Sequence, residues 1–311
     1  MSPIFKWLRL PAEIFFRRED ERIYAAVRIV FAAVALLNLI FLWPDRQVFF
    51  SYAGMMDSDV IRSQASPAYL SIFALARSES AVTLCMLLTA LALVMLMAGI
   101  GTRMAAFVSL VWHVSYTARA PLALGGWDVV LRSFSFLILV SPLGKCWTLP
   151  ALLRAGGKSA AAAVSRHGLV LMRLQVVVIY WQAVMRRLLS PDPYWGDGEF
   201  LSYFMLSHHA RWPGAWVLNS ETFLACATHA LQLAEIAIPV LLWVKKTRWW
   251  GALLGFGLHA GISIFSRDLG LFFLAMMMTY LAFLRREDVE GLERHLRRLF
   301  IRGGKRGAVS P

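Results

Sequence analysis

Residues 81–100 read AVTLCMLLTALALVMLMAGI, and no charged side chain interrupts them. A helix needs about 20 largely apolar residues to cross the hydrocarbon core of a bilayer. This stretch has that length, and Gly99 and Gly101 follow its apolar part as turn residues. It therefore predicts a membrane-spanning helix, and it decides how the rest of the chain is interpreted.

The composition of the whole chain agrees with a membrane protein. Of its 311 residues, 59% are hydrophobic and 16% are charged, and its mean hydropathy is +0.59. Soluble domains are about half apolar and a quarter charged, and disordered chains contain few aromatic residues. The three cysteines show no paired spacing, which argues against a disulfide framework or a structural zinc site. The composition thus excludes an ordinary soluble domain and intrinsic disorder.

Seven further apolar stretches accompany the first one. We expect an all-α integral membrane protein, a bundle of about eight transmembrane helices with additional helices at the interface. The segment before the bundle, 1–23, and the tail after it, 285–311, are basic and amphipathic, and 24–284 forms the transmembrane domain. The predicted spans are 24–43, 81–100, 104–118, 127–140, 168–185, 222–244, 249–265 and 269–284, with interfacial helices over 68–76 and 200–217 and a linker over 145–167 that holds a short surface helix.

The distribution of Lys and Arg sets the expected orientation. Eight spans place both termini on one side, and the cytoplasmic side of a membrane protein carries the excess of basic residues. With both termini inside, the basic residues of 1–23, 145–167, 245–248 and the tail gather on the cytoplasmic side. The net charge of +13 then reflects this rim, and we expect membrane lipids and no nucleic acid as partners. Short loops favour a bacterial inner membrane.

Glu235 is the most informative ionisable residue within a predicted span, with His229 and Gln232 on roughly the same side of the helix. Ionisable groups at membrane depth are costly and face the interior of a bundle or a water-filled cavity. Two alternatives follow. Glu235 is a proton acceptor, or it pairs with an arginine of another helix and holds the bundle together.

His259 presents a similar choice within the span over 249–265. It is either a hydrogen-bonded packing residue or an acid/base group, and the glycines before it allow a neighbour to approach closely. No metal site is expected, because no span contains a pair of histidines at metal-binding spacing.

The end of the span over 168–185 carries the residues most suggestive of a binding site: Tyr180, Trp181, Arg186 and Arg187. The two arginines either reach the interface beside aromatic residues or bind an oxyanion through their bidentate donors. Asp128 opens another span, where it either caps the helix and pairs with Arg132 or lines the mouth of an outer cavity.

Together these residues resemble the HTTM family (horizontally transferred transmembrane domain), which includes the membrane part of vitamin K-dependent γ-glutamyl carboxylases. The resemblance extends from about residue 28 to 284. It rests on the order and spacing of a few motifs, none of them specific alone: Gly125-Gly126-x-Asp128, then Gln175 through Tyr180 to Arg186-Arg187, Trp195-Gly196, His229, Glu235, Pro239 and His259.

The resemblance implies quinol chemistry. In such carboxylases a quinol is oxidised by oxygen, and the resulting base removes a proton from a peptide glutamate. The family has a lysine pair where this chain has Arg186 and Arg187, and Val184 takes the place of a glycine. Arginine stays protonated in proteins, so Arg187 can stabilise an anion but cannot deprotonate a quinol. This departure argues against peptide carboxylation.

Two functions remain from the sequence. The first is a carboxylase-like protein with an outer-side cavity for a quinone, a hydroquinone or another lipid-soluble molecule. As an enzyme it would be a quinone-linked oxidoreductase or a carboxylase-like lyase, with Glu235, His259 and Arg187 as catalytic residues and Arg186, Tyr180, Trp181, Asp128 and His229 in the binding site. The second is a non-catalytic accessory subunit of a maturation, secretion or electron-transfer system, with a membrane protein as its partner.

Overall fold

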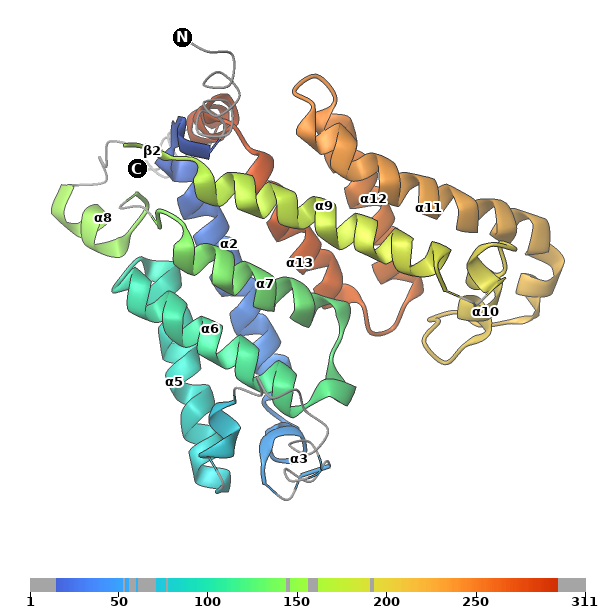
Figure 1. Cartoon of the computed structure of the whole chain (residues 1–311), viewed down its shortest axis with the longest axis horizontal. Coiled ribbons are helices and arrows are strands. Elements are labelled where there is room, and N and C mark those ends of the chain that lie inside the picture. The colour runs from blue at the N-terminus through green and yellow to red at the C-terminus, as the bar shows by residue number, and fades with distance from the viewer. Residues whose placement is uncertain are drawn as a thin grey trace, which may run out of the picture.

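The computed structural model describes residues 15–52, 54–55, 60, 71–76, 78–143, 146–155, 162–190 and 193–295 (Figure 1). Helices dominate this part of the chain, which confirms the all-α fold class. The long helices are α2 (Glu21–Leu42), α5 (Glu79–Ala98), α6 (Thr102–Arg119), α7 (Gly126–Val140), α9 (His167–Leu188), α11 (Glu221–Trp243), α12 (Arg248–Phe265) and α13 (Gly270–Tyr280).

Within the described residues, four helices are long and apolar enough to cross a membrane. They cover Glu21–Leu42, Glu79–Ala98, His167–Leu188 and Trp216–Trp243. Gly270–Phe283 is a shorter apolar helix. These helices indicate a membrane protein, as the composition predicts.

Local sequence signals explain where α5 begins and ends. The hydroxyl of Ser78 accepts a hydrogen bond from the backbone N–H of Ala81 at 3.2 Å, which satisfies one of the free donors of the first turn. Gly99 ends the helix with a φ of +74°, which glycine adopts without steric cost. A side chain at Gly99 would also collide with Thr148, so this turn packs directly on the segment before α8 (Leu149–Ala155).

Short elements connect the long helices, and one of them corrects a prediction. The helix expected over 200–217 ends at Leu206, where α10 (Phe200–Leu206) stops. Ser207 adopts an extended conformation, and Pro213 follows soon afterwards and disfavours helical backbone before it. The remaining short elements are α3 (Arg46–Phe50), η1 (Ile72–Ala74), η2 (Pro121–Ala123), η3 (Pro193–Trp195), η4 (Ala215–Ser220), η5 (Leu281–Phe283) and a helix over 286–295. The interfacial helix predicted over 68–76 lies partly outside the described residues; the described part of this stretch contains η1.

A two-stranded antiparallel sheet is an element that the sequence does not predict. β1 (Arg18–Asp20) pairs with β2 (Ala163–Ser165), so that Arg18 lies opposite Ser165. β2 lies in the predicted linker over 145–167, which also contains the expected short surface helix as α8. The sheet joins the start of α2 to the start of α9.

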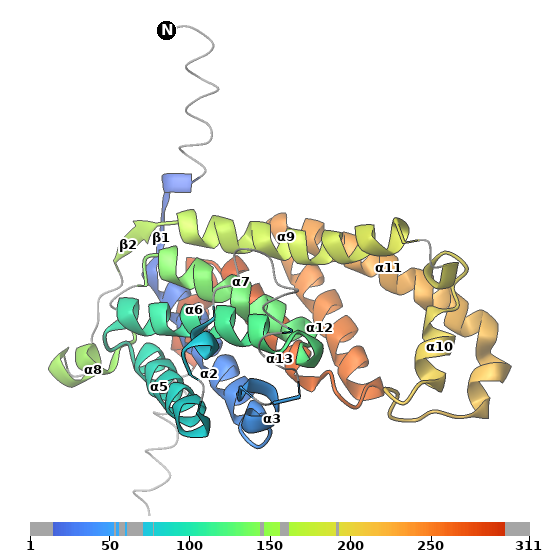
Figure 2. The same ribbon diagram turned by 60° about the horizontal axis from the view of Figure 1, so that its bottom comes forward.

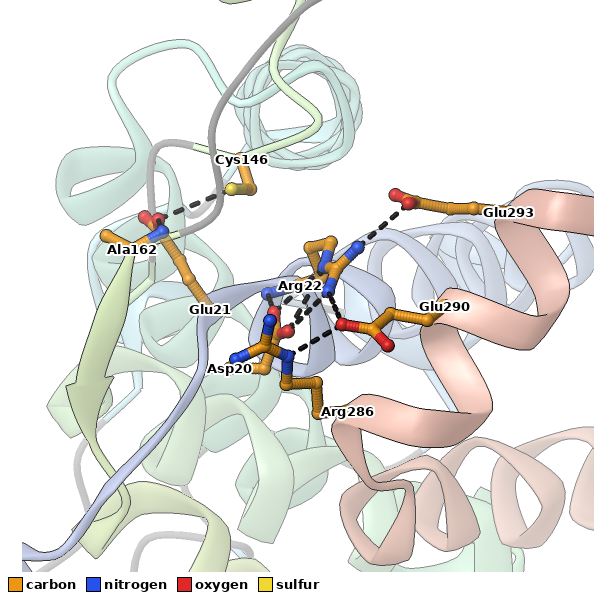
Figure 3. A network of polar contacts seen from close by, with 8 residues as sticks. All are labelled: Asp20, Glu21, Arg22, Cys146, Ala162, Arg286, Glu290 and Glu293. Carbon is orange, nitrogen blue, oxygen red and sulfur yellow. Dashed lines mark hydrogen bonds and ion pairs between the residues drawn. The ribbon is translucent and has the colours of Figure 1, made fainter. Parts of the chain in front are cut away.

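An ion-pair network at the same end holds the helix over 286–295 in place (Figure 3). Arg22 Nη1 donates to Glu293 Oε2 at 2.8 Å, and Arg22 Nη2 lies 2.6 Å from Asp20 Oδ2 and 3.6 Å from Glu290 Oε1. Arg286 also pairs with Glu290, at 2.6 Å. Burial alone would raise the pKa of Asp20, and the hydrogen bonds from Arg22 outweigh it, so this pKa lies below its ordinary value.

Arginines of two long helices hydrogen-bond to neighbouring backbone segments at one end of the bundle. At the end that carries the sheet, Arg28 of α2 donates to the carbonyl of Trp147 at 2.9 Å, and Arg173 of α9 donates to the carbonyl of Ala282 at 2.8 Å. Figures 1 and 2 show α10 and the start of α11 far from the sheet. α13 packs against α2, α7, α9 and α12, and so connects the early helices α2 and α7 with the later helices α9 and α12.

Candidate functional site

One face of α9 carries the residues around which the candidate site is built. Tyr180, Val184 and Arg187 follow each other at helical spacing, four and then three residues apart. The side chains of Tyr180 and Val184 are buried. Arg186 lies about 100° around the helix from Arg187 and is exposed, so the structure separates the two arginines that the sequence analysis grouped together.

Arg187 forms an ion pair with Glu235 of α11. Its Nη1 donates to Glu235 Oε2, and the exposed fractions of the two side chains are 25% and 11%. The guanidinium of Arg187 also lies 3.9 Å from the ring centroid of Trp195, close enough for a cation–π interaction. The structure thus shows the second alternative for Glu235, a pair with an arginine of another helix. Because Glu235 compensates the charge of Arg187, this guanidinium is not a free oxyanion site.

Tyr180 connects three helices through its hydroxyl group. The Tyr180 hydroxyl lies 2.6 Å from His259 Nε2 of α12 and is also hydrogen-bonded to the hydroxyl of Tyr280 at the end of α13. His259 is therefore hydrogen-bonded inside the bundle, as its packing alternative predicts. Buried hydroxyl and imidazole groups with such partners hold one defined arrangement of side chains.

Gly255 makes the approach of Tyr280 possible. It lies one turn before His259 on the same face of α12, and both are buried. A Cβ atom at Gly255 would collide with the Tyr280 hydroxyl. The absence of a side chain at this position is what allows the Tyr280 hydroxyl to approach.

The second ring nitrogen of His259, Nδ1, lacks a hydrogen bond of the kind that Nε2 makes with Tyr180. Nδ1 is buried and has no hydrogen-bond partner among the residues that the structure describes. The ring of Phe272 lies edge-on to the imidazole, with the ring centroids 5.2 Å apart. Buried polar atoms in proteins almost always have a partner, so an unsatisfied one in a native fold marks a position for a water molecule, a ligand or a chemical role.

The ion pair and the hydroxyl network belong to one site. Tyr180 shares its helix face with Arg187, and Arg187 pairs with Glu235. We call the set of Tyr180, Arg187, Glu235, His259 and Tyr280 the α9 site. It combines a compensated cation with neutral hydrogen-bonding groups, an arrangement suited to a neutral molecule that carries oxygen atoms.

Asp128 lies in a separate polar network. Its Oδ1 accepts hydrogen bonds from the Tyr116 hydroxyl at 2.6 Å and from Asn38 Nδ2 at 3.1 Å, and its Oδ2 accepts one from the backbone N–H of Gly125 at 2.7 Å. The predicted cap of α7 is therefore confirmed. The predicted pairing with Arg132 is wrong, because Arg132 donates to the Thr117 hydroxyl at 3.4 Å.

Two other residues of the predicted binding site also lie outside the α9 site. Trp181 is exposed, and its indole N–H donates to the carbonyl of Ile236 at 3.4 Å. His229 is exposed, and its Nε2 faces Gly198, where a side chain would meet it at 3.1 Å. Neither residue is part of the hydrogen-bonded network around Tyr180.

Sequence reasoning missed Tyr280; it predicted a close approach at the glycines before His259 but did not identify Tyr280 as the neighbour. Tyr280 follows a run of methionines near the end of an apolar helix, and only the fold brings it to Tyr180. A usable signal was the spacing of Gly255 and His259, which places a glycine directly beside a buried histidine on one face of α12. In the described part of the chain, no group of three or more His, Cys, Asp or Glu side chains is placed to hold a metal ion.

No protein-family model, no curated protein and no solved structure matches this chain.

Proposed function

We propose that the chain is an HTTM-like protein of eight spans that binds a quinone, or another lipid-soluble molecule with oxygen atoms, in the α9 site. The single observation that carries this proposal is the geometry of His259. Its Nε2 is hydrogen-bonded to the Tyr180 hydroxyl, and its Nδ1 has no hydrogen-bond partner among the described residues. Both atoms belong to a buried side chain of α12, inside an apolar bundle. A polar atom in that position is suited to a ligand that enters from the lipid.

The contacts at the helix ends support eight spans. At the end with the sheet, Arg103 near the start of α6 donates to the carbonyl of Leu139 near the end of α7. At the opposite end, Trp127 near the start of α7 donates to Asn38 Oδ1 near the end of α2, at 3.2 Å. By these contacts α7 runs opposite to both α2 and α6, as the proposed order of eight membrane crossings requires of these three helices.

The orientation follows from charge. The end with the sheet carries the described parts of the basic segments that the positive-inside rule assigns to the cytoplasm, so the proposal places both termini in the cytoplasm and the α9 site in the outer half of a bacterial inner membrane. Fusion of green fluorescent protein or alkaline phosphatase to the C-terminus tests this. We expect fluorescence and no phosphatase activity, and the reverse pattern would contradict the orientation.

The residues of the α9 site have distinct roles in this proposal. Arg187 stays protonated, so Glu235 and His259 are the groups able to exchange a proton. A bound quinone would supply two-electron redox chemistry, which side chains alone do not provide. As an enzyme, the protein would be a quinone-linked oxidoreductase or a carboxylase-like lyase, without peptide carboxylation.

Extraction of the purified protein tests the binding proposal. We expect mass spectrometry to find a quinone in wild-type protein and in a His208→Gln control, which changes an exposed histidine outside the site. The quinone should be lost from a protein with both Tyr180→Phe and His259→Gln. Equal quinone content in all three proteins would show that the molecule comes from co-purifying lipid and would overturn the proposal.

The Arg187–Glu235 pair favours a second candidate, a non-catalytic accessory subunit in which the pair only fastens α9 to α11. Arg187→Lys separates the two. Oxygen-dependent oxidation of an added hydroquinone by this variant would support a catalytic ancestry of the site. A variant that folds and binds quinone but remains inactive would favour the accessory role, and affinity purification from membranes would then recover a partner in fixed stoichiometry.

A further inference from the structure

The direction of the hydrogen bonds in the α9 site follows from the chemistry of its members. A phenol hydroxyl is a better donor than a neutral imidazole N–H, and an unprotonated ring nitrogen is a better acceptor than a phenol oxygen. The Tyr180 hydroxyl therefore donates to His259 Nε2, at 2.6 Å. Because its one proton is then used, Tyr180 accepts from the Tyr280 hydroxyl.

This order fixes the tautomer of His259. The hydrogen bond made by one ring nitrogen determines which nitrogen carries the proton, so acceptance at Nε2 places the proton on Nδ1. Nδ1 is the buried atom that has no partner within the described residues. The imidazole is therefore a neutral donor whose Nδ1–H has no hydrogen-bond acceptor among the described residues.

We propose that Tyr280 and Tyr180 hold His259 as its Nδ1–H tautomer, and that Nδ1 donates to a neutral acceptor oxygen, such as a carbonyl, of the molecule bound in the α9 site. His259 is then the binding residue, and Tyr180 and Tyr280 are positioning residues. The ligand part of this inference rests on the proposed function, whereas the tautomer of His259 does not.

Gly255 is a third positioning residue. A side chain at this position would push the Tyr280 hydroxyl away from Tyr180, and the donor order would lose its first member. Gly257 on the same helix provides a matched control, because a Cβ there meets open space. The two glycines differ in their neighbours and not in their helix.

The charge of the site agrees with a neutral oxygen as acceptor. Glu235 compensates Arg187, and the donor offered by His259 is an uncharged N–H. A carboxylate ligand would instead compete with Glu235 for the guanidinium, at the cost of leaving one carboxylate without its partner. A carbonyl group makes its hydrogen bond without disturbing that pair.

The tautomer is tested by ¹⁵N NMR of histidine-labelled protein in lipid bilayers, with the His259 signals assigned from a His259→Gln spectrum. We expect a protonated Nδ1 and an unprotonated Nε2 in wild-type protein and in the control Tyr203→Phe, which changes an exposed tyrosine. Tyr180→Phe removes the donor, so His259 should shift toward the Nε2–H tautomer that neutral histidine prefers in water. An Nε2–H signal in wild-type protein would overturn the inference.

The ligand part is tested with a short-tailed benzoquinone and with an arene of the same size that lacks oxygen. We expect His259→Gln and Gly255→Ala to weaken benzoquinone binding about 3- to 10-fold, the loss typical of one hydrogen bond, and to leave arene partitioning unchanged. Gly257→Ala should bind like wild type. If wild-type protein binds no benzoquinone, the proposed function fails while the NMR result stands; if it binds and Gly255→Ala binds equally well, the positioning role is refuted.

Discussion

The ion pair between Arg187 and Glu235 gives the sharpest test of how the α9 site is built. The perturbation is a cycle of Arg187→Met, Glu235→Leu and the double variant. Removing one member of a buried ion pair leaves an uncompensated charge, which costs about 3–5 kcal/mol, whereas replacing both with apolar residues is often neutral. The cycle therefore separates the interaction from the loss of either side chain.

The structure predicts unequal effects of the two single changes. Glu235 lies in the middle of α11 and is 11% exposed, so Arg187→Met leaves its carboxylate inside the bundle and should cost about 3 kcal/mol. Glu235→Leu leaves an arginine that is 25% exposed and stacked on Trp195, and its guanidinium can reach the interface, so about 1–2 kcal/mol is expected. The double variant should lose less than about 1 kcal/mol.

Reversible unfolding in mixed micelles, followed by circular dichroism as the fraction of SDS rises, measures these free energies. The matched control is Arg186→Met, which removes the exposed neighbouring arginine and should add to Glu235→Leu within about 0.5 kcal/mol. If the Arg187 and Glu235 changes are also additive, the pair contributes no coupling energy and our description of the site is wrong.

Three further changes test the fold around the site. Asp128→Ala removes the acceptor of three hydrogen bonds, two of them buried, so it should lower the free energy of unfolding in mixed micelles by about 3 kcal/mol. The pKa of Asp20 lies below its ordinary value of 3.8 because the hydrogen bonds from Arg22 outweigh the effect of burial. The stability that ionised Asp20 contributes is therefore complete above pH 3.8 and is lost as the pH falls through the lowered pKa. Asp20→Asn should reduce this fall of the melting temperature at acid pH, which we call the acid limb. Arg28→Met removes the donor that holds the carbonyls of residues 146 and 147, so Cys146, 1% exposed, should react faster with N-ethylmaleimide.

The chain offers control residues for the Asp128 and Arg28 predictions. Asp197→Ala removes an exposed carboxylate and should leave the unfolding free energy within about 0.5 kcal/mol. The exposed Cys226 should be modified at the same rate with and without Arg28→Met. Unchanged protection of Cys146 in the variant would show that Arg28 does not hold this segment, and an unaltered acid limb after Asp20→Asn would assign the limb to other groups.

The positions of the long helices could be predicted from the sequence because apolar length is a local property. The spans predicted over 81–100 and 222–244 correspond to helices over Glu79–Ala98 and Glu221–Trp243. The sheet between β1 and β2 could not be predicted, because its strands are three residues each and lie more than 140 residues apart. Their pairing depends on the bundle that brings α2 and α9 together.

The part of the α9 site that depends on local spacing could also be predicted from the sequence. Helical spacing from Tyr180 selects Arg187 over Arg186, so the separation of the two arginines could be predicted from the sequence. The partner of Glu235 and the contact between Tyr180 and Tyr280 join residues 48 and 100 positions apart, and no periodic pattern contains them. Which polar residues share a site was therefore decided by packing.

Photolabelling tests the central claim most directly. Membranes that contain the protein are illuminated with an azido-substituted quinone, and the labelled peptides are mapped by mass spectrometry. We expect labels near Tyr180 in α9 and His259 in α12 that excess unlabelled quinone removes. Labels confined to outward-facing residues such as Leu87 and Leu91 of α5, undiminished by the competitor, would contradict it.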